Sequence, residues 1–339
     1  MVAKPQPNNI QVVKPKSAKS APGKLLSRLD NLQLNNRRFS FIYAVLKKYG
    51  DDEGGNQAAL VTYYGFLSLF PLLVAALSMT ELSALRSAHL RSSVTTALNK
   101  YFPLVGHQLE SHVHSQGKVG IALGLSLLIT IYGAKGVATA LRQAMDHIWQ
   151  VPRAERSTGA KGILRSFAII VFGGIGFVAT GILSSYGSGN SGNIGLQIAA
   201  MVLSLIVTFL ALLIVFKLSI SRFIEARFLL VGSALAAIGL QLVQAGGGFL
   251  ITHELKHFSS LYGSLALVFV VLFWIYLQVR ILFYATEIDT VRKFGLWPRS
   301  LTAFRLTQAD RKALKLYAER EAMVEEPAEE VNVDFNARP

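Results

Sequence analysis

The sequence contains six apolar runs, and each is long enough to cross a bilayer as a helix. A helix rises about 1.5 Å per residue, so about 20 apolar residues cover a hydrocarbon core of roughly 30 Å. The runs lack the alternation of polar and apolar residues that is typical of strands. We therefore predict an all-α fold, a polytopic membrane helix bundle with six transmembrane helices. The spans are expected at about 58–79, 119–140, 166–185, 195–216, 228–251 and 261–286.

Lysine and arginine are distributed unevenly between the segments that connect these runs. When alternate segments are assigned to opposite sides of the membrane, 27 basic residues fall on the side of both termini and five on the other. Basic residues gather on the cytoplasmic side of membrane proteins, so both termini are predicted to be cytoplasmic. The same distribution accounts for most of the net charge of +14, and no nucleic-acid partner is expected. The absence of cysteine excludes disulfides and thiolate metal sites.

The segment before the first span has two parts. Residues 1–24 are rich in proline, lysine and serine, and we predict that they are disordered. Residues 25–57 are predicted to contain a cytoplasmic amphipathic helix, whose apolar stripe includes Phe39, Ile42 and Leu46. Such a stripe fits an interfacial helix on the cytoplasmic leaflet or a helix packed on protein. The sequence leaves both readings open.

The segment after the last span is predicted to be soluble. The six-helix bundle is expected to occupy residues 58–290, and residues 291–339 then form a cytoplasmic C-terminal tail. This tail begins basic and ends acidic, which is typical of a solvated segment. We predict one short helix in it, over 307–324.

Five ionisable residues lie within or beside the predicted spans, where a charge is costly and is often functional. They form the candidate polar or ligand-binding site: Lys135, Arg142, Asp146, Arg280 and Glu287. Helical periodicity places the first three on one helix face and the last two on another. Two readings remain open. The groups line a polar cavity that binds an anionic headgroup or relays charge, or they snorkel to the interface and form structural pairs.

Two ion pairs are compatible with this spacing. Arg142 and Asp146 are four residues apart on one helix and can form a pair at the cytoplasmic edge. Lys135 and Glu287 both lie toward the cytoplasmic ends of their spans, so a pair across two helices is geometrically possible.

One stretch resembles the zinc-binding motif of metalloproteases. It reads His253-Glu254-Leu255-Lys256-His257 and falls in a short loop predicted on the external side, followed at once by the sixth span. A zinc protease needs the motif within a stable helix, together with a third ligand. In the first external loop, His112 and His114 lack the following Asp-His of a two-metal ribonuclease. Phosphate-binding glycine loops and nucleophile elbows are also absent. We therefore predict no metal, no cofactor and no catalytic residue.

Three motifs occur in the predicted membrane region. They are Asn56-Gln57-Ala58-Ala59-Leu60 continuing to Ser68-Leu69-Phe70-Pro71-Leu72-Leu73, Asp146-His147-Ile148-Trp149, and Phe258-Ser259-Ser260-Leu261-Tyr262-Gly263-Ser264 continuing to Ala285-Thr286-Glu287. In order and spacing these motifs resemble the YihY/BrkB family of bacterial inner-membrane proteins, over roughly residues 40–295. Two departures are visible. That family usually has Asn where Asp146 stands, and more often reads Gly-Ala-Glu where this chain has Ala285-Thr286-Glu287.

The resemblance implies a fold and a location more than an activity. It implies a multi-pass protein of the bacterial inner (plasma) membrane. Members of the family have carried a ribonuclease label that looks like a misassignment, and ribonuclease activity is not expected here.

The leading hypothesis is a non-enzymatic membrane protein that transports or senses a lipid or other amphiphile of the cell envelope. Its partners would be membrane lipids, and its ligand an anionic lipid or amphiphile. A first alternative is a membrane-edge zinc hydrolase that uses His253, Glu254 and His257. A second is a scaffold whose cytoplasmic tails recruit partners. The sequence does not specify the oligomeric state.

Overall fold

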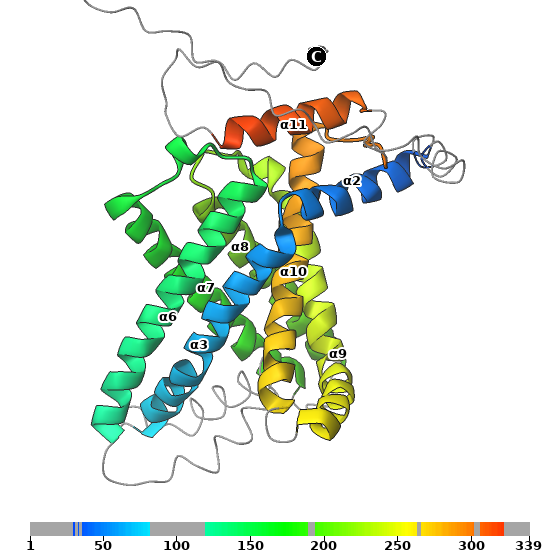
Figure 1. Cartoon of the computed structure of the whole chain (residues 1–339). Helices are drawn as coiled ribbons and strands as arrows, with labels where there is room; N and C mark the ends of the chain where they lie inside the picture. The colour runs from blue at the N-terminus through cyan, green and yellow to red at the C-terminus, as the bar shows by residue number, and fades with distance from the viewer. Residues whose placement is uncertain are drawn as a thin grey trace, which may run out of the picture.

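A computed structural model shows a bundle of long helices with shorter helices gathered at one end (Figure 1). The elements of regular structure in the described part of the chain are all helices. The residues that the structure describes are 30, 33, 36–81, 119–188, 194–262, 266–301 and 306–321. The expected disordered segment 1–24 and the histidines of the first external loop lie outside these residues.

Six long helices form the bundle. They are α3 (Gly54–Glu81), α6 (Val119–Ile148), α7 (Gly159–Ser188), α8 (Ile194–Ser219), α9 (Leu230–Tyr262) and α10 (Ala266–Phe294). The most extensive contacts join α3 to α6, α7 to α8, and α9 to α10. Within the described residues, four helices contain a segment long and apolar enough to cross a membrane. These segments are Gly159–Leu183, Ile194–Ser219, Leu230–Gly247 and Val268–Phe294.

Large apolar side chains cover the outside of the bundle. Tyr132, Leu164 and Met201 expose 76%, 69% and 62% of their surface, respectively. A soluble protein rarely leaves so much apolar surface in water, whereas lipid chains solvate it well. The exposed surface therefore supports a membrane protein.

Glycine allows α3 and α6 to approach closely. A Cβ atom at position 133 of α6 would lie 3.0 Å from the Cα atom of Ser68 in α3. The two helix backbones can come this close only because residue 133 has no side chain. Small residues at the interface play the same role in other membrane helix pairs. The pair α3–α6 is thereby held together beside the cleft described below.

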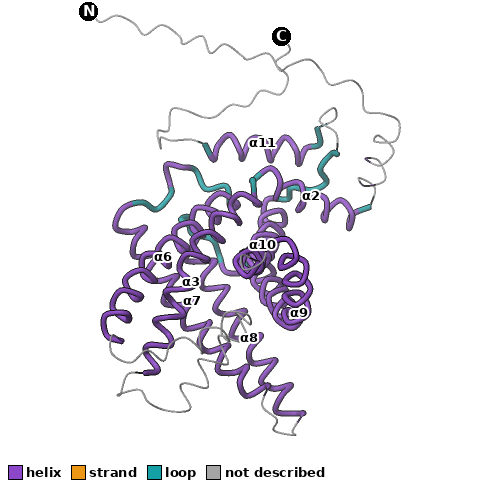
Figure 2. The backbone as a smooth tube through the Cα atoms, turned by 60° about the horizontal axis from the view of Figure 1, so that its bottom comes forward, coloured by secondary structure: helices purple, strands orange, loops and turns teal. Residues whose placement is uncertain are grey.

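The shorter helices lie at one end of the bundle, here called the α2–α11 end (Figures 1 and 2). They are α2 (Arg37–Asp51), η2 (Arg153–Glu155), η3 (Ala226–Phe228) and α11 (Gln308–Arg320). Helix α11 begins with a capping box, in which the Thr307 hydroxyl accepts from the Asp310 backbone N–H and the Asp310 carboxylate accepts from the Thr307 backbone N–H. A short helix was predicted over 307–324, and the structure has one over Gln308–Arg320.

A small apolar cluster fastens α2 and α11 to the end of α10. It consists of the buried residues Ala44, Val45, Val291, Leu296 and Ala313. The ring of Phe41 also meets that of Trp297 edge-on, with centroids 5.4 Å apart. Helix α2 is thus packed on protein along one face.

The prediction of a loop between the fifth and sixth spans was wrong. Helix α9 runs without a break from Leu230 to Tyr262, so His253, Glu254 and His257 lie in a helix rather than a loop. Polar composition suggested the loop, but polar residues do not end a helix whose hydrogen bonds are made within its own backbone. Proline, which is the strongest sequence signal for a helix end, does not occur between residue 251, where the predicted fifth span ends, and Tyr262.

Candidate functional site

A polar cleft of about 790 Å³ opens at the α2–α11 end of the bundle. It lies between α3, α6, the first turns of α7 and the end of α11, and the segment between α6 and α7 contributes to its wall. Most of the residues that line it are polar or charged, and the apolar side chains of Leu60 and Ile163 also line it. Both of these apolar side chains are exposed. The cleft therefore combines charged residues with exposed apolar side chains.

One face of α6 forms a wall of the cleft. Lys135, Thr139, Arg142 and Asp146 all line it, and their spacing extends over about 16 Å at 1.5 Å per residue. The Lys135 side chain is exposed and makes no ion pair with a carboxylate within the described residues. The three charged residues that periodicity placed on one helix face thus face the same cleft.

Arg142 is a buried cation that forms no ion pair within the described residues. Only 7% of its surface is exposed. Its guanidinium donates to the backbone oxygens of Gly162, at 2.7 Å, and Ser157, and to the Ser166 hydroxyl at 3.1 Å. Its Nε is buried without an acceptor. Burial of a charge without an ion-pair partner is costly, so this arginine is the least compensated charge of the cleft wall.

The i,i+4 ion pair between Arg142 and Asp146 is not formed in the structure. Asp146 instead accepts hydrogen bonds from the backbone N–H of Ser221, at 2.6 Å, and from its hydroxyl, at 2.7 Å. These bonds tie the end of α6 to the turn that follows α8. Two neutral donors thus bond to this carboxylate, and it makes no hydrogen bond or ion pair to the arginine beside it.

Arg156 is a second arginine of the wall without a carboxylate partner among the described residues. Its Nε donates to the Val151 carbonyl oxygen at 3.3 Å, and one terminal nitrogen is buried without an acceptor. Burial lowers the pKa of Arg156, and the nearby Asp146 carboxylate opposes that shift. Lys135, Arg142 and Arg156 thus give the cleft three cations that form no ion pair with any residue the structure describes.

The end of α11 closes the cleft on the side of η2. Glu321 accepts from Arg153 at 2.7 Å, and Arg320 donates to Asp52 at 2.8 Å and to the Gln150 side-chain oxygen at 3.3 Å. The Arg153–Glu321 pair is about half exposed, whereas Arg320 and Asp52 are buried. A C-terminal helix therefore completes a site that is built mainly from α3, α6 and α7.

A buried ion network lies next to the cleft and centres on Lys48. Its ammonium is fully buried, bonds to Asp52, and lies 2.7 Å from a Glu287 carboxylate oxygen and 2.9 Å from the Ile148 carbonyl oxygen. Burial opposes its charge, but the two carboxylates outweigh burial and raise the pKa of Lys48 above its ordinary value. This lysine joins α2, α6 and α10 at one point.

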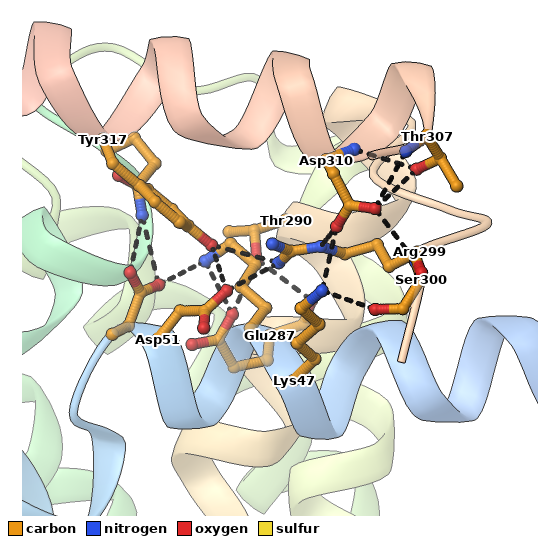
Figure 3. A network of polar contacts seen from close by, with 12 residues as sticks. Lys47, Asp51, Glu287, Thr290, Arg299, Ser300, Thr307, Asp310 and Tyr317 are labelled. Atoms are coloured by element: carbon orange, nitrogen blue, oxygen red, sulfur yellow. Dashed lines mark hydrogen bonds and ion pairs between the residues drawn. The ribbon is translucent and has the colours of Figure 1, made fainter. Parts of the chain in front are cut away.

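The network continues between α2 and α11 (Figure 3). Arg299 bonds to Asp51 at 2.9 Å and to Asp310 at 3.0 Å, and Lys47 bonds to the same Asp310 oxygen at 3.0 Å. Burial alone would raise the pKa of Asp310, but hydrogen bonds from Ser300, Lys47 and other donors lower it to about 2.

The charges of the buried ion network balance. Its four cations are Lys47, Lys48, Arg299 and Arg320, and its four carboxylates are Asp51, Asp52, Glu287 and Asp310. A balanced network needs no external ion, so we interpret it as structural. The cleft, with its unneutralised cations, is the candidate ligand site.

The five predicted site residues fall in three places. Lys135, Arg142 and Asp146 line the cleft, and Glu287 belongs to the buried ion network. The pair between Lys135 and Glu287 is not formed, because Glu287 faces α2 and bonds to Lys48 instead. The sequence analysis missed this role of Lys48, which resembled an ordinary basic residue beside a membrane span. Its one sequence signal is Asp52, four residues later.

Arg280 is held by aromatic rings outside the cleft. Its guanidinium carbon lies 5.5 to 5.8 Å from the ring centroids of Tyr49, Tyr276 and Tyr284, and it donates to the Tyr284 hydroxyl at 3.2 Å. Cation–π contacts of this kind stabilise a partly desolvated arginine. Arg280 therefore does not share a site with Lys135 and Arg142.

Among the side chains that the structure describes, no group of three or more His, Cys, Asp or Glu residues is placed to hold a metal ion. The side chains of His253, Glu254 and His257 lie outside that set.

The sequence profile described as Virulence factor BrkB matches residues 45–295. The chain belongs to this family. The match includes the cleft residues of α3, α6 and α7, and Lys48 and Glu287 of the network. It ends before Arg299 and α11. The cleft therefore lies within the BrkB region, and the helix that closes it lies beyond.

Several curated bacterial membrane proteins are similar to this chain at low sequence identity. A UPF0761 membrane protein of Chromohalobacter salexigens is 24% identical over 72% of this chain, and one of Psychrobacter is 25% identical over 74%. The ribonuclease-like protein YfkH of Bacillus subtilis is 23% identical over 74% of this chain and 94% of its own length. The alignments cover only 61% and 48% of the first two relatives. No solved structure matches the chain.

Proposed function

We propose that this BrkB-family protein binds the headgroup of an anionic lipid or other amphiphile in the polar cleft, and transports or senses it. The single observation that carries the proposal is Arg142. It is a buried guanidinium on the wall of a cleft, with no carboxylate partner among the described residues. An anionic headgroup in the cleft would supply an ion-pair partner for this guanidinium.

The shape of the cleft supports an amphiphile rather than a small soluble anion. Its wall along α6 carries the cations Lys135 and Arg142, and the exposed apolar side chains of Leu60 and Ile163 also line the cleft. A headgroup can contact the cations while its acyl chains stay against the apolar surface of the bundle. Anionic lipids also reach such a site from within the membrane, without passing through water.

We further propose six spans, an inner-membrane location and cytoplasmic termini. Helices α3 and α6, with 28 and 30 residues, are long enough to complete the set with α7 to α10. The distribution of 27 against five basic residues supports the α2–α11 end as the cytoplasmic side. The cleft then opens toward the cytoplasmic leaflet.

The test is mass spectrometry of lipids that remain bound to protein purified in mild detergent. We expect one class of anionic lipid to be retained well above its membrane abundance. Lys135→Ala should reduce that retention, because Lys135 is exposed in the cleft and its loss leaves the fold intact. Lys217→Ala is the matched control, since Lys217 is an exposed lysine at the same end of the bundle but outside the cleft. Lipid bound only in membrane proportions would overturn the proposal.

We propose no enzymatic role for the cleft. One observation keeps the zinc hydrolase as a second candidate, because the backbone of His253 and His257 is helical and their spacing of four places both on one helix face. Metal analysis of the purified protein tests it. Zinc in stoichiometric amount, lost in His253→Ala, would support that candidate, and metal-free protein would exclude it.

A further inference from the structure

Helix α2 has two unlike faces. One face carries Phe41, Ala44 and Lys48, and it packs against α10 and α11. The opposite face carries Phe39, Ile42 and Leu46, whose exposed fractions are 63%, 55% and 51%. These three residues follow the spacing of one helical stripe. The described residues thus leave an apolar stripe uncovered on a helix whose other face is anchored.

We propose that this stripe lies in the surface of the anionic cytoplasmic leaflet, so that α2 is an interfacial membrane helix. The proposal goes beyond the function of the cleft and does not depend on it. The occupant of the stripe is the bilayer that surrounds the spans, rather than a separate protein.

The position of α2 places the stripe on the membrane side. Helix α2 runs sideways from the end of α3, across the direction of the long helices, and α11 lies on the side away from the bundle (Figure 1). Lys47 and Asp51 extend from α2 toward α11 and its flanking segment, where they bond to Asp310 and Arg299 (Figure 3). The face opposite to α11 is therefore turned toward the part of the bundle that the bilayer surrounds.

The charge of α2 favours anionic lipid. The segment from residue 31 to residue 50 contains no Asp or Glu, and Arg37 and Arg38 begin the helix with exposed side chains. Both lie next to Phe39, at the end of the helix farthest from α3. Apolar side chains at the acyl boundary with basic residues at the headgroups are the pattern of interfacial helices. Anionic headgroups attract juxtamembrane basic residues.

The absence of native cysteine allows a clean test with single spin labels. Labels are introduced by Phe39→Cys, Ile42→Cys or Leu46→Cys in the full chain, reconstituted in nanodiscs that contain phosphatidylglycerol. Collision rates are then measured with oxygen, which concentrates in lipid, and with a water-soluble nickel chelate. Leu128→Cys on the exposed surface of α6 serves as the lipid reference, and Lys312→Cys on α11 as the water reference.

We expect the three α2 labels to resemble the Leu128 label, with oxygen collisions exceeding nickel collisions. Arg37→Gln together with Arg38→Gln should shift the Phe39 label toward the water reference. Nickel accessibility equal to that at Lys312 would overturn the proposal. So would low accessibility to both reagents, which would mean that protein covers the stripe. Strong dipolar broadening between labels at Ile42 would identify that protein as a second copy and would equally overturn it.

Discussion

The ammonium of Lys48 lies 2.7 Å from a carboxylate oxygen of Glu287, although 239 residues separate them in sequence and both side chains are fully buried. The contact locks α2, which precedes the first long helix, onto α10, the last one. Asp52 and the carbonyl oxygen of Ile148 complete the environment of the ammonium. A single buried cation therefore links α2, α6 and α10, beside the apolar cluster that packs α2 against α10.

Removal of that cation should destabilise the protein strongly. Lys48→Met leaves Asp52 and Glu287 buried without their shared partner, and loss of one partner of a buried ion pair costs roughly 3–5 kcal/mol. We expect a large fall in the unfolding temperature measured in detergent. Arg153→Gln is the control, because its pair with Glu321 is about half exposed and should contribute little. The double variant Lys48→Met with Glu287→Gln should recover part of the loss. Equal effects of Lys48→Met and Arg153→Gln would contradict this account.

Arg320→Gln should have an intermediate effect. It removes one partner of Asp52, but Lys48 and Gln150 still bond to that carboxylate. We therefore expect a fall in unfolding temperature smaller than that of Lys48→Met and larger than that of Lys315→Gln, an exposed lysine of the same helix α11. Thermal unfolding of the three variants side by side gives the order. An Arg320→Gln protein as stable as the Lys315→Gln protein would show that the end of α11 is not held by Asp52.

Docking of α11 should depend on pH through Asp310. Hydrogen bonds lower the pKa of Asp310 to about 2, whereas an unfolded Asp has a pKa near about 3.9. A lowered pKa contributes stability that is complete above the unfolded pKa and is lost as the pH falls through the folded one. Docking should therefore weaken between about pH 4 and pH 2. The mobility of a spin label at Leu314, on the exposed side of α11, reports this. Asp310→Asn should show high mobility already at neutral pH, and an unchanged label in that variant would rule out the role of Asp310.

Periodicity predicted the cleft-facing stripe of α6 because residues seven and eleven apart share a face of any straight helix. The partners of these residues depend on which helices pack together, and nothing local in the sequence encodes that. Asp146 therefore bonds to Ser221 rather than to Arg142, and Glu287 to Lys48 rather than to Lys135. The extension of α9 was missed for a related reason. Hydropathy reports which residues suit lipid, and it says little about where the backbone hydrogen bonds of a helix stop.

Gly162 offers a direct test of the link between Arg142 and lipid binding. A Cβ atom at this position would lie 3.2 Å from both terminal nitrogens of the Arg142 guanidinium and 2.9 Å from the Ser157 carbonyl oxygen. Gly162→Ala should therefore displace the guanidinium without removing its charge. We expect retention of anionic lipid to fall several-fold by mass spectrometry, and the unfolding temperature to fall as well, because the Ser157 backbone must also shift.

The matched control for Gly162→Ala is Gly174→Ala on the same helix, where a Cβ atom meets nothing within 4 Å. Alanine also favours helix over glycine by roughly 1 kcal/mol, so this variant should be at least as stable as the original protein and should retain lipid normally. Equal lipid retention by the two glycine variants would mean that the position of the Arg142 guanidinium does not matter for binding. The charge of the cleft as a whole, rather than this arginine, would then be the feature that lipids recognise.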